Sequence, residues 1–249
     1  MQIHIVGIND MGRMAAELFT EMIASKPDCV LGLATGSTPL PLYRELVDRS
    51  KAGTVDFSQV RSVNLDEYMG LEPTHPQSYR LFMQQHLFDH IPIDPDNTCL
   101  PEGLSDDIPA MCKDYDARIA SWGGIDLQLL GIGNNGHIGF NEPGTAFTLR
   151  THLVQISEST RLANARFFED DPEKVPAQAV TMGIGNIMSA RRILLLVNGA
   201  NKAEILYRAL FEDVTPQAPA SVLQLHPNVT VIADYEAAAR IETMQVKML

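Results

Sequence analysis

A histidine and a glutamate five residues apart are the side chains of this sequence best suited to acid–base chemistry. They are His137 and Glu142, in the glycine-rich stretch Gly131–Gly144. A carboxylate beside an imidazole fixes the orientation of the ring and favours its charged form. Such a pair can move protons at a bound substrate. The alternative interpretation is that His137 has only a structural role. The polar and glycine residues around His137 argue against that interpretation.

The same stretch contains the pattern G-x-G-x-x-G at Gly131, Gly133 and Gly136. In a dinucleotide-binding fold, a helix opens at the third glycine of this pattern. Here Gly139 and Pro143 follow too soon for a long helix. The sequence therefore disfavours a nucleotide site.

The loop Ala34–Pro39 is typical of an anion site. Gly36 lets a ligand approach the backbone, and Ser37 and Thr38 offer hydroxyl groups. A helix beginning at Pro39 would add free N–H donors, and phosphate is the usual ligand of such a loop. An ordinary capped turn is equally compatible with these residues. The Gly-Lys-Ser/Thr of a Walker loop is absent.

Two adjacent carboxylates, Asp66 and Glu67, follow an apolar segment. Side chains of neighbouring residues leaving a strand point in different directions. One carboxylate can therefore face a ligand as a general base while the other is solvated or paired. Helix capping or a surface charge pair is the alternative.

Two cations complete the candidate residues. Lys202 is predicted to open a helix after an apolar strand, whereas cations are usually favoured at the other helix end. Arg166 lies in the segment 161–168. A solvated surface lysine is the alternative for Lys202. No group of His, Cys and carboxylates has metal-ligand spacing, so we expect no metal.

Alternating strands and helices must position these residues. Predicted strands cover Ile3–Val6, Val30–Ala34, Val60–Leu65, Asp126–Leu130, Ile193–Val197 and Val229–Ala233. Predicted helices include segments around 14–23, 39–47, 79–88, 111–122 and 203–210, and Asp94–Asp107 is predicted to be a loop. Several strands are continuous apolar runs, which indicates a parallel sheet between two helical layers. Ligands bind at the carboxyl ends of such strands, where the loops after four strands can meet.

The composition sets limits on partners and compartment. With 249 residues, of which 45% are hydrophobic, the chain can bury a full core, and we expect a single domain over residues 1–249. Its net charge of −12 disfavours a nucleic-acid partner. Three cysteines without a C-x-x-C motif suggest a reducing compartment. We see no signal-peptide or membrane-spanning pattern, so we expect the cytoplasm and no membrane partner.

Six motifs, in order along the chain, resemble those of the glucosamine-6-phosphate deaminase family. The most specific are Asn-Leu-Asp-Glu-Tyr at 64–68 and Gly-His-Ile-Gly-Phe-Asn-Glu-Pro at 136–143; the others are 33–39, 160–168, 199–202 and 223–227. The resemblance implies a Rossmann-like three-layer α/β/α sandwich with a mostly parallel central sheet. It also implies conversion of glucosamine 6-phosphate and water to fructose 6-phosphate and ammonia, without a cofactor.

The resemblance further implies a role for each candidate residue. Asp66 matches the base that moves a proton between C2 and C1, and His137 matches the residue that opens the sugar ring. Glu142 and Asn135 match its supporting partners. The phosphate-binding set matches Gly36, Ser37, Thr38, Arg166 and Lys202.

The chain departs from the family in two respects. Some members have Asp where this chain has Asn135, so support of His137 must rest on Glu142. Allosteric hexameric members bind N-acetylglucosamine 6-phosphate through basic residues that match His152 and Val154 here. The C-terminal extension of those members also has no counterpart before Leu249. We therefore expect no activation by that effector, and a monomer or small homo-oligomer.

Three alternatives remain open at this point. A galactosamine-6-phosphate deaminase differs only in the orientation of one substrate hydroxyl. A 6-phosphogluconolactonase has no use for a C2 base, so Asp66 argues against it. A non-enzymatic sugar-phosphate sensor would not need Asp66, His137 and Glu142 together.

Overall fold

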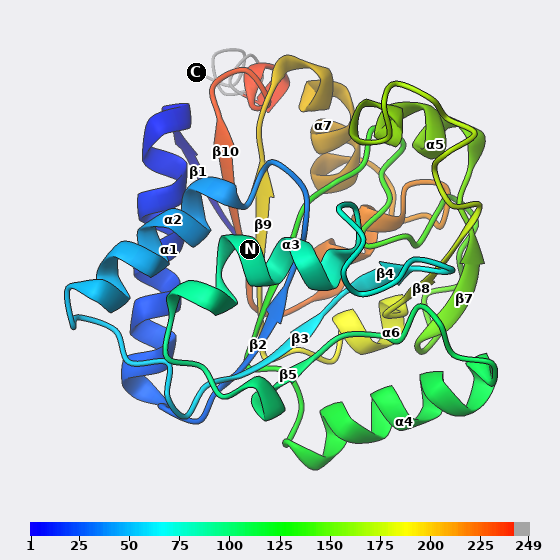
Figure 1. Ribbon diagram of the computed structural model, residues 1–249. Coiled ribbons are helices and arrows are strands. Elements are labelled where there is room, and N and C mark those ends of the chain that lie inside the picture. The colour runs from blue at the N-terminus through cyan, green and yellow to red at the C-terminus, as the bar shows by residue number, and fades with distance from the viewer. Residues whose placement is uncertain (242–249) are drawn as a thin grey trace, which may run out of the picture.

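A seven-stranded parallel sheet forms the centre of the computed structural model, which describes residues 1–241 (Figure 1). Its strands are β1 (Gln2–Val6), β2 (Val30–Leu33), β3 (Arg61–Asn64), β5 (Thr98–Cys99), β6 (Leu127–Leu130), β9 (Arg192–Val197) and β10 (Val229–Asp234), in the order β1-β10-β9-β6-β2-β3-β5. Every neighbouring pair is parallel. Strands β2, β6 and β10 are buried along their whole length, as expected when both faces of a sheet are covered.

Helices cover both faces of this sheet. They are α1 (Ile8–Ser25), α2 (Leu40–Lys51), α3 (Tyr79–His86), α4 (Ile108–Ser121), α5 (Glu158–Asn164), α6 (Ile184–Ile187) and α7 (Ala203–Phe211). The chain crosses the sheet in one direction from β1 to β5 and returns from β6 to β10. Right-handed crossovers then place α1, α2 and α3 on one face, with α7 on the other (Figure 1). The predicted three-layer arrangement is confirmed.

A second, antiparallel sheet lies beside the first. Its strands are β4 (Asp66–Tyr68), β7 (His152–Gln155) and β8 (Gln178–Thr181), in the order β4-β8-β7. A small apolar cluster fills one face of this sheet and includes Tyr68, Phe140 and Phe168. The 3-10 helices are η1 (Phe88–His90), η2 (Pro95–Asn97), η3 (Ala165–Phe167), η4 (Ala200–Lys202) and η5 (Pro219–Leu225).

Several predicted boundaries were wrong. The first helix begins at Ile8, well before the predicted segment, and α2 begins at Leu40, with Pro39 as its N-cap instead of its first residue. Helix α4 begins at Ile108, because the side chain of Asp107 accepts the N–H of Ala110 and caps it. The predicted loop 94–107 contains η2 and the edge strand β5. In residues 1–241, no helix is long and apolar enough to cross a membrane.

Candidate active site

A cavity of about 980 Å³ opens at the carboxyl ends of β2, β6 and β9. Strands β2 and β6 are neighbours, but the chain leaves β2 toward β3 and leaves β6 toward β9. The loops after these two strands diverge, and the crevice between them is where open α/β sheets bind ligands. The loops after β2, β3, β6 and β9 all contribute to the wall, so the four loops do meet.

His137, Asn135 and Glu142 form one connected group on the loop after β6. His137 Nδ1 lies 3.7 Å from Glu142 Oε1, and Asn135 Nδ2 donates to Glu142 Oε2 at 2.6 Å. His137 and Asn135 line the cavity, and Glu142 contacts them from behind. Burial disfavours ionisation of Glu142, but His137, the Thr160 hydroxyl and the Asn135 amide outweigh it and lower its pKa to about 2. A carboxylate is therefore held beside the imidazole.

Two glycines allow this packing. A Cβ atom at position 133 would lie 2.3 Å from the ring of His137. At Gly139 the backbone is left-handed (φ +56°), and a Cβ would lie 2.9 Å from Thr181 Oγ1 and 3.4 Å from Asp66 Oδ2. Residues 131–151 contain neither a helix nor a named strand. The glycine pattern thus serves close packing around the histidine, and no helix opens at Gly136.

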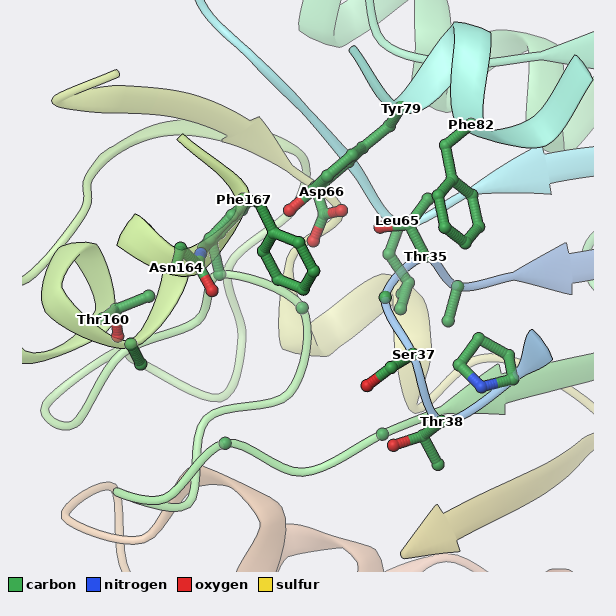
Figure 2. Close-up of a pocket in the computed structure, with 18 of the residues that line it drawn as sticks. Thr35, Ser37, Thr38, Leu65, Asp66, Tyr79, Phe82, Thr160, Asn164 and Phe167 are labelled. Atoms are coloured by element: carbon green, nitrogen blue, oxygen red, sulfur yellow. The ribbon is translucent and has the colours of Figure 1, made fainter. Parts of the chain in front are cut away.

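Asp66 begins β4 and faces the cavity, with only 7% of its surface exposed. Burial, together with the charge of Glu67, raises the pKa of Asp66 to about 8. Figure 2 shows its carboxyl group pointing toward the same hollow as Ser37, with the hydroxyl of Tyr79 beside it. A carboxyl group in this setting is poised to exchange a proton near neutral pH.

Glu67 turns away from Asp66 and has a structural role. Its carboxylate accepts the backbone N–H groups of Tyr68, Tyr79 and Arg80, each at 2.9 Å. Two of these donors belong to the first turn of α3, so the helix-capping alternative holds for Glu67. Alternation along β4 thus directs one carboxylate to the cavity and the other to a helix end.

Two cations, Lys202 and Arg166, line the cavity. Lys202 Nζ donates to the carbonyl oxygen of Ile132 at 2.7 Å. Burial, with the charge of Arg166, lowers the pKa of Lys202 to about 8. Arg166 is exposed, and its guanidinium lies over the ring of Phe167. Two cations that line one cavity can both bind an anion placed between them.

The loop after β2 forms the wall near these cations. Gly36, Ser37 and Thr38 all line the cavity, and Gly36 is left-handed (φ +96°). Thr38 Oγ1 donates to Asn198 Oδ1 at 2.6 Å, which ties this loop to the loop after β9. The loop leads into α2, which begins at Leu40.

The family motif at 160–168 was matched from the sequence, but Thr160 and Asn164, two α5 residues that line the cavity, were not singled out. Thr160 and Asn164 lie one turn apart on α5 and face the site. Thr160 Oγ1 donates to Glu142 Oε1 at 2.6 Å, and Asn164 Nδ2 donates to Tyr68 Oη at 2.9 Å. The sequence signal available for this pair was the spacing of four residues between Thr160 and Asn164, in a helix that follows the N-cap Ser157. Nothing in the sequence indicated which partners these side chains contact.

All nine predicted site residues lie at or directly behind this cavity. Among residues 1–241, no group of three or more His, Cys, Asp or Glu is arranged to hold a metal ion. Of the other histidines, His86 lines the cavity, whereas His226 is buried and hydrogen-bonded to the carbonyl oxygen of Ala190.

Comparisons with known proteins agree with the resemblance. The family described as glucosamine-6-phosphate isomerases/6-phosphogluconolactonase matches residues 7–232. A glucosamine-6-phosphate deaminase of Lachnoclostridium phytofermentans is 55% identical over 234 residues, covering 94% of this chain and 99% of the relative. Glucosamine-6-phosphate deaminase 2 of Bacillus subtilis is 51% identical over 235 residues, covering 94% of each chain.

Solved structures give the same picture. A monomeric glucosamine-6-phosphate deaminase is 45% identical with a TM-score of 0.94, covering 96% of this chain and 99% of its own. The 6-phosphogluconolactonase of Trypanosoma brucei is 20% identical with a TM-score of 0.75, covering 96% of this chain and 98% of its own. The second likeness shows a shared fold alone.

Proposed function

The chain belongs to the family of glucosamine-6-phosphate isomerases and 6-phosphogluconolactonases. We propose that, of the activities in this family, it has the deaminase activity. It is a glucosamine-6-phosphate deaminase, as are relatives that are 50–55% identical over most of the chain. It converts glucosamine 6-phosphate and water to fructose 6-phosphate and ammonia. This reaction breaks down amino sugars and feeds glycolysis.

Ring opening is the first step. His137 carries a proton from the C1 hydroxyl to the ring oxygen, so that the ring C–O bond breaks and C1 becomes an aldehyde. The carboxylate of Glu142, 3.7 Å from Nδ1, stabilises the imidazolium that forms during this transfer. Asn135 cannot ionise, and its amide instead fixes Oε2 of the carboxylate.

Proton transfer between carbons follows. The carboxylate of Asp66 takes the proton from C2, which the aldehyde at C1 acidifies. The ammonium group on C2 gives a proton to the aldehyde oxygen, and an enolamine forms. Asp66 returns the proton to C1, which leaves a C=N bond at C2. Water adds to C2 and ammonia leaves, giving the ketose. The raised pKa of Asp66 supports this role, because a base must also be a competent acid when it returns the proton.

The phosphate group orients the sugar for these steps. Lys202 and Arg166 supply charge, while Ser37, Thr38 and the backbone at Gly36 supply hydrogen-bond donors. Anchoring one end of a flexible substrate holds C1 and C2 near their catalytic groups. The steps consist of proton transfers and the addition of water, none of which requires a cofactor, so we propose that no cofactor takes part.

One observation carries the assignment: the buried carboxyl group of Asp66 opens onto the same cavity as His137 and Lys202. A lactonase hydrolyses an ester and needs no base at C2, and a sensor needs neither the base nor the histidine pair. The epimeric galactosamine 6-phosphate remains a second candidate substrate, because its C2 and phosphate are the same.

The test is ammonia release from purified protein, coupled to glutamate dehydrogenase. We expect turnover of glucosamine 6-phosphate with a kcat/KM at least tenfold above that for galactosamine 6-phosphate. Hydrolysis of 6-phosphogluconolactone should not exceed the uncatalysed rate. Absence of ammonia release with both amino sugars would overturn the assignment.

We also propose the setting in which the reaction takes place. The substrate is a small amino-sugar phosphate, and neither nucleic acid nor a membrane is a partner. We propose that residues 1–249 form a single cytoplasmic domain. It acts as a monomer or small homo-oligomer, in keeping with the monomeric relative.

A further inference from the structure

The hydroxyl group of Thr160 contacts the carboxylate behind the catalytic histidine. Thr160 lies in α5 and only 5% of its surface is exposed. Its Oγ1 accepts a hydrogen bond from Ser157 Oγ at 3.0 Å and donates one to Glu142 Oε1 at 2.6 Å. Hydrogen bonds arranged in such a chain polarise one another, and a bond to an ionised acceptor is stronger than a neutral one.

The oxygen that Thr160 holds is the one that faces His137. Oε1 of Glu142 lies 3.7 Å from His137 Nδ1, while Oε2 is bonded to Asn135. Glu142 can rotate about its side-chain bonds, and one bond to Oε2 fixes only one end of the carboxylate. The Thr160 hydroxyl fixes the other end. The distance between Oε1 and Nδ1 therefore depends on both donors.

A second contact fixes the position of α5 itself. Asn164, one turn after Thr160, donates to the hydroxyl of Tyr68 in β4. Helix α5 is thus attached both to the loop that carries Glu142 and to the strand that begins with Asp66. Its continuation, η3, carries Arg166. The orientation of Glu142 and the position of Arg166 therefore depend on one short segment.

We propose that Thr160 is a positioning residue for ring opening, an inference that rests on the proposed function. It holds Glu142 Oε1 toward His137 Nδ1, so that the imidazole is oriented when it moves a proton from the C1 hydroxyl to the ring oxygen. Thr160 itself touches no reacting atom. Its loss therefore slows ring opening and leaves C2 chemistry and phosphate binding in place.

The experiment measures ring opening apart from deamination. In the Asp66→Asn background, C2 chemistry is blocked, and enzyme-catalysed exchange between the α and β anomers of glucosamine 6-phosphate reports ring opening. Magnetisation-transfer NMR gives this exchange rate. We expect Thr160→Val, which keeps the shape and removes the hydroxyl, to slow the exchange about tenfold or more. Thr160→Ser should restore it. In the otherwise native protein, Thr160→Val should lower kcat similarly and leave KM within about twofold.

Thr145→Val is the matched control. The Thr145 hydroxyl donates to the backbone carbonyl of the same Glu142 at 2.7 Å, so its removal deletes a bond of similar length that does not reach the carboxylate. Thermal melting checks that each variant is folded, and Thr160→Ala repeats the test if Thr160→Val does not fold.

The outcomes separate this inference from the proposed function. Equal slowing by Thr145→Val and Thr160→Val, or unchanged exchange in Thr160→Val and Thr160→Ala, would overturn the role of Thr160. Exchange that is absent in Asp66→Asn alone would overturn ring opening by His137 and the inference with it. A native protein that releases no ammonia refutes the function itself.

Discussion

The carboxyl group of Asp66 is buried, yet it must ionise to accept a proton from C2. The Asp66→Asn variant keeps the shape of the side chain and removes its basicity. Loss of a general base typically costs about 10²–10⁴-fold in rate, so we expect kcat to fall by this factor. The phosphate contacts are untouched, and substrate binding measured by calorimetry should stay within a few-fold. Near-normal turnover would remove Asp66 from the mechanism.

The same variant should be more stable than the native protein at alkaline pH. The folded-state pKa of Asp66 is about 8, above its ordinary value, because burial and Glu67 disfavour the charge. The stability associated with the protonated form is therefore complete below about pH 4 and is lost as pH rises through about 8. Urea unfolding should give Asp66→Asn an advantage of at least about 2 kcal/mol at pH 8 and almost none at pH 4. An advantage independent of pH would contradict this account.

Lys202 and Arg166 should control affinity for the phosphate group. Each charge-assisted hydrogen bond is worth about 1.5–3 kcal/mol, so Lys202→Ala and Arg166→Ala should each raise KM roughly ten- to hundredfold. The exposed Lys174, paired with Glu169 on the surface, is the control, and Lys174→Ala should leave KM unchanged. If both alanine variants bind substrate normally, the phosphate lies elsewhere.

The pH dependence of kcat/KM should be bell-shaped with its maximum near 8. Asp66 must be ionised, which limits the rate below its pKa of about 8. Lys202 must be protonated to bind the phosphate dianion, which limits the rate above its pKa of about 8. Lys202→Arg keeps its charge at high pH, so the alkaline limb should move upward while the acid limb stays in place. If the alkaline limb does not move in this variant, Lys202 is not the group that titrates there, and the limb reports the amine of the substrate instead.

At the scale of elements, the ends of neighbouring strands support one another. Asp234, the last residue of β10, accepts the N–H of Gly199 with both carboxylate oxygens, at 3.1 and 3.0 Å. Gly199 begins the turn that presents Lys202. The loop after β9 therefore depends on a carboxylate of the adjacent strand.

Asp234→Ala should loosen this loop and act through Lys202. We expect KM to rise several-fold with kcat nearly unchanged, because the catalytic groups lie on other loops. Steady-state kinetics measures this, and Asp234→Asn, which retains an acceptor oxygen, should have a smaller effect. A fall in kcat at constant KM would mean that the turn has another role.

Helices and strands were predictable from the sequence where a local pattern of apolar residues determines them. Strand β9 is apolar from Ile193 to Val197 and β6 is apolar apart from Gln128, and the residues after both strands were expected at the site. Strands β7 and β8 have four residues each, and β7 is largely half-exposed. Neither segment is therefore long enough to show the alternation of apolar and polar residues that identifies a strand. Asp66 and Glu67 were predicted to lie in a loop after the strand Val60–Leu65, because the pairing partner of β4, which is β8, lies more than a hundred residues away in sequence. The bond between Thr160 and Glu142 depends on the same kind of non-local packing.

At the scale of the whole molecule, the class of fold was predictable but the strand order was not. The alternation of elements indicates a parallel sheet, whereas the crevice arises because the chain reverses direction between β2 and β6. That reversal depends on which helices cover which face, and no single segment encodes it. The roles of the site residues came from the family resemblance and remain predictions.

We expect no activation by N-acetylglucosamine 6-phosphate. Its phosphate needs cations, but the matching positions lie in β7, where Val154 packs against an apolar cluster and His152 is bonded to the backbone of Arg150. The side chain of Arg150 is bonded to Asn186. Substrate saturation should be hyperbolic with and without effector, and size-exclusion chromatography should show a monomer or small oligomer. A sigmoidal curve that the effector makes hyperbolic would refute this.

The pairing of β1 with β10 bears on how the protein is made. Gln2–Val6 lies alongside Thr230–Asp234, so β1 can pair with its neighbour only after the long segment between them, with all the other strands, has been synthesised. Contacts so far apart in sequence slow folding, and an unpaired strand edge is prone to aggregation until its partner has been synthesised. Asp234, which holds the turn before Lys202, arrives with that same last strand. A nascent chain that stalls before β10 would therefore lack both the sheet edge and a complete phosphate site, which makes translation speed and chaperone capture relevant to the yield of active enzyme.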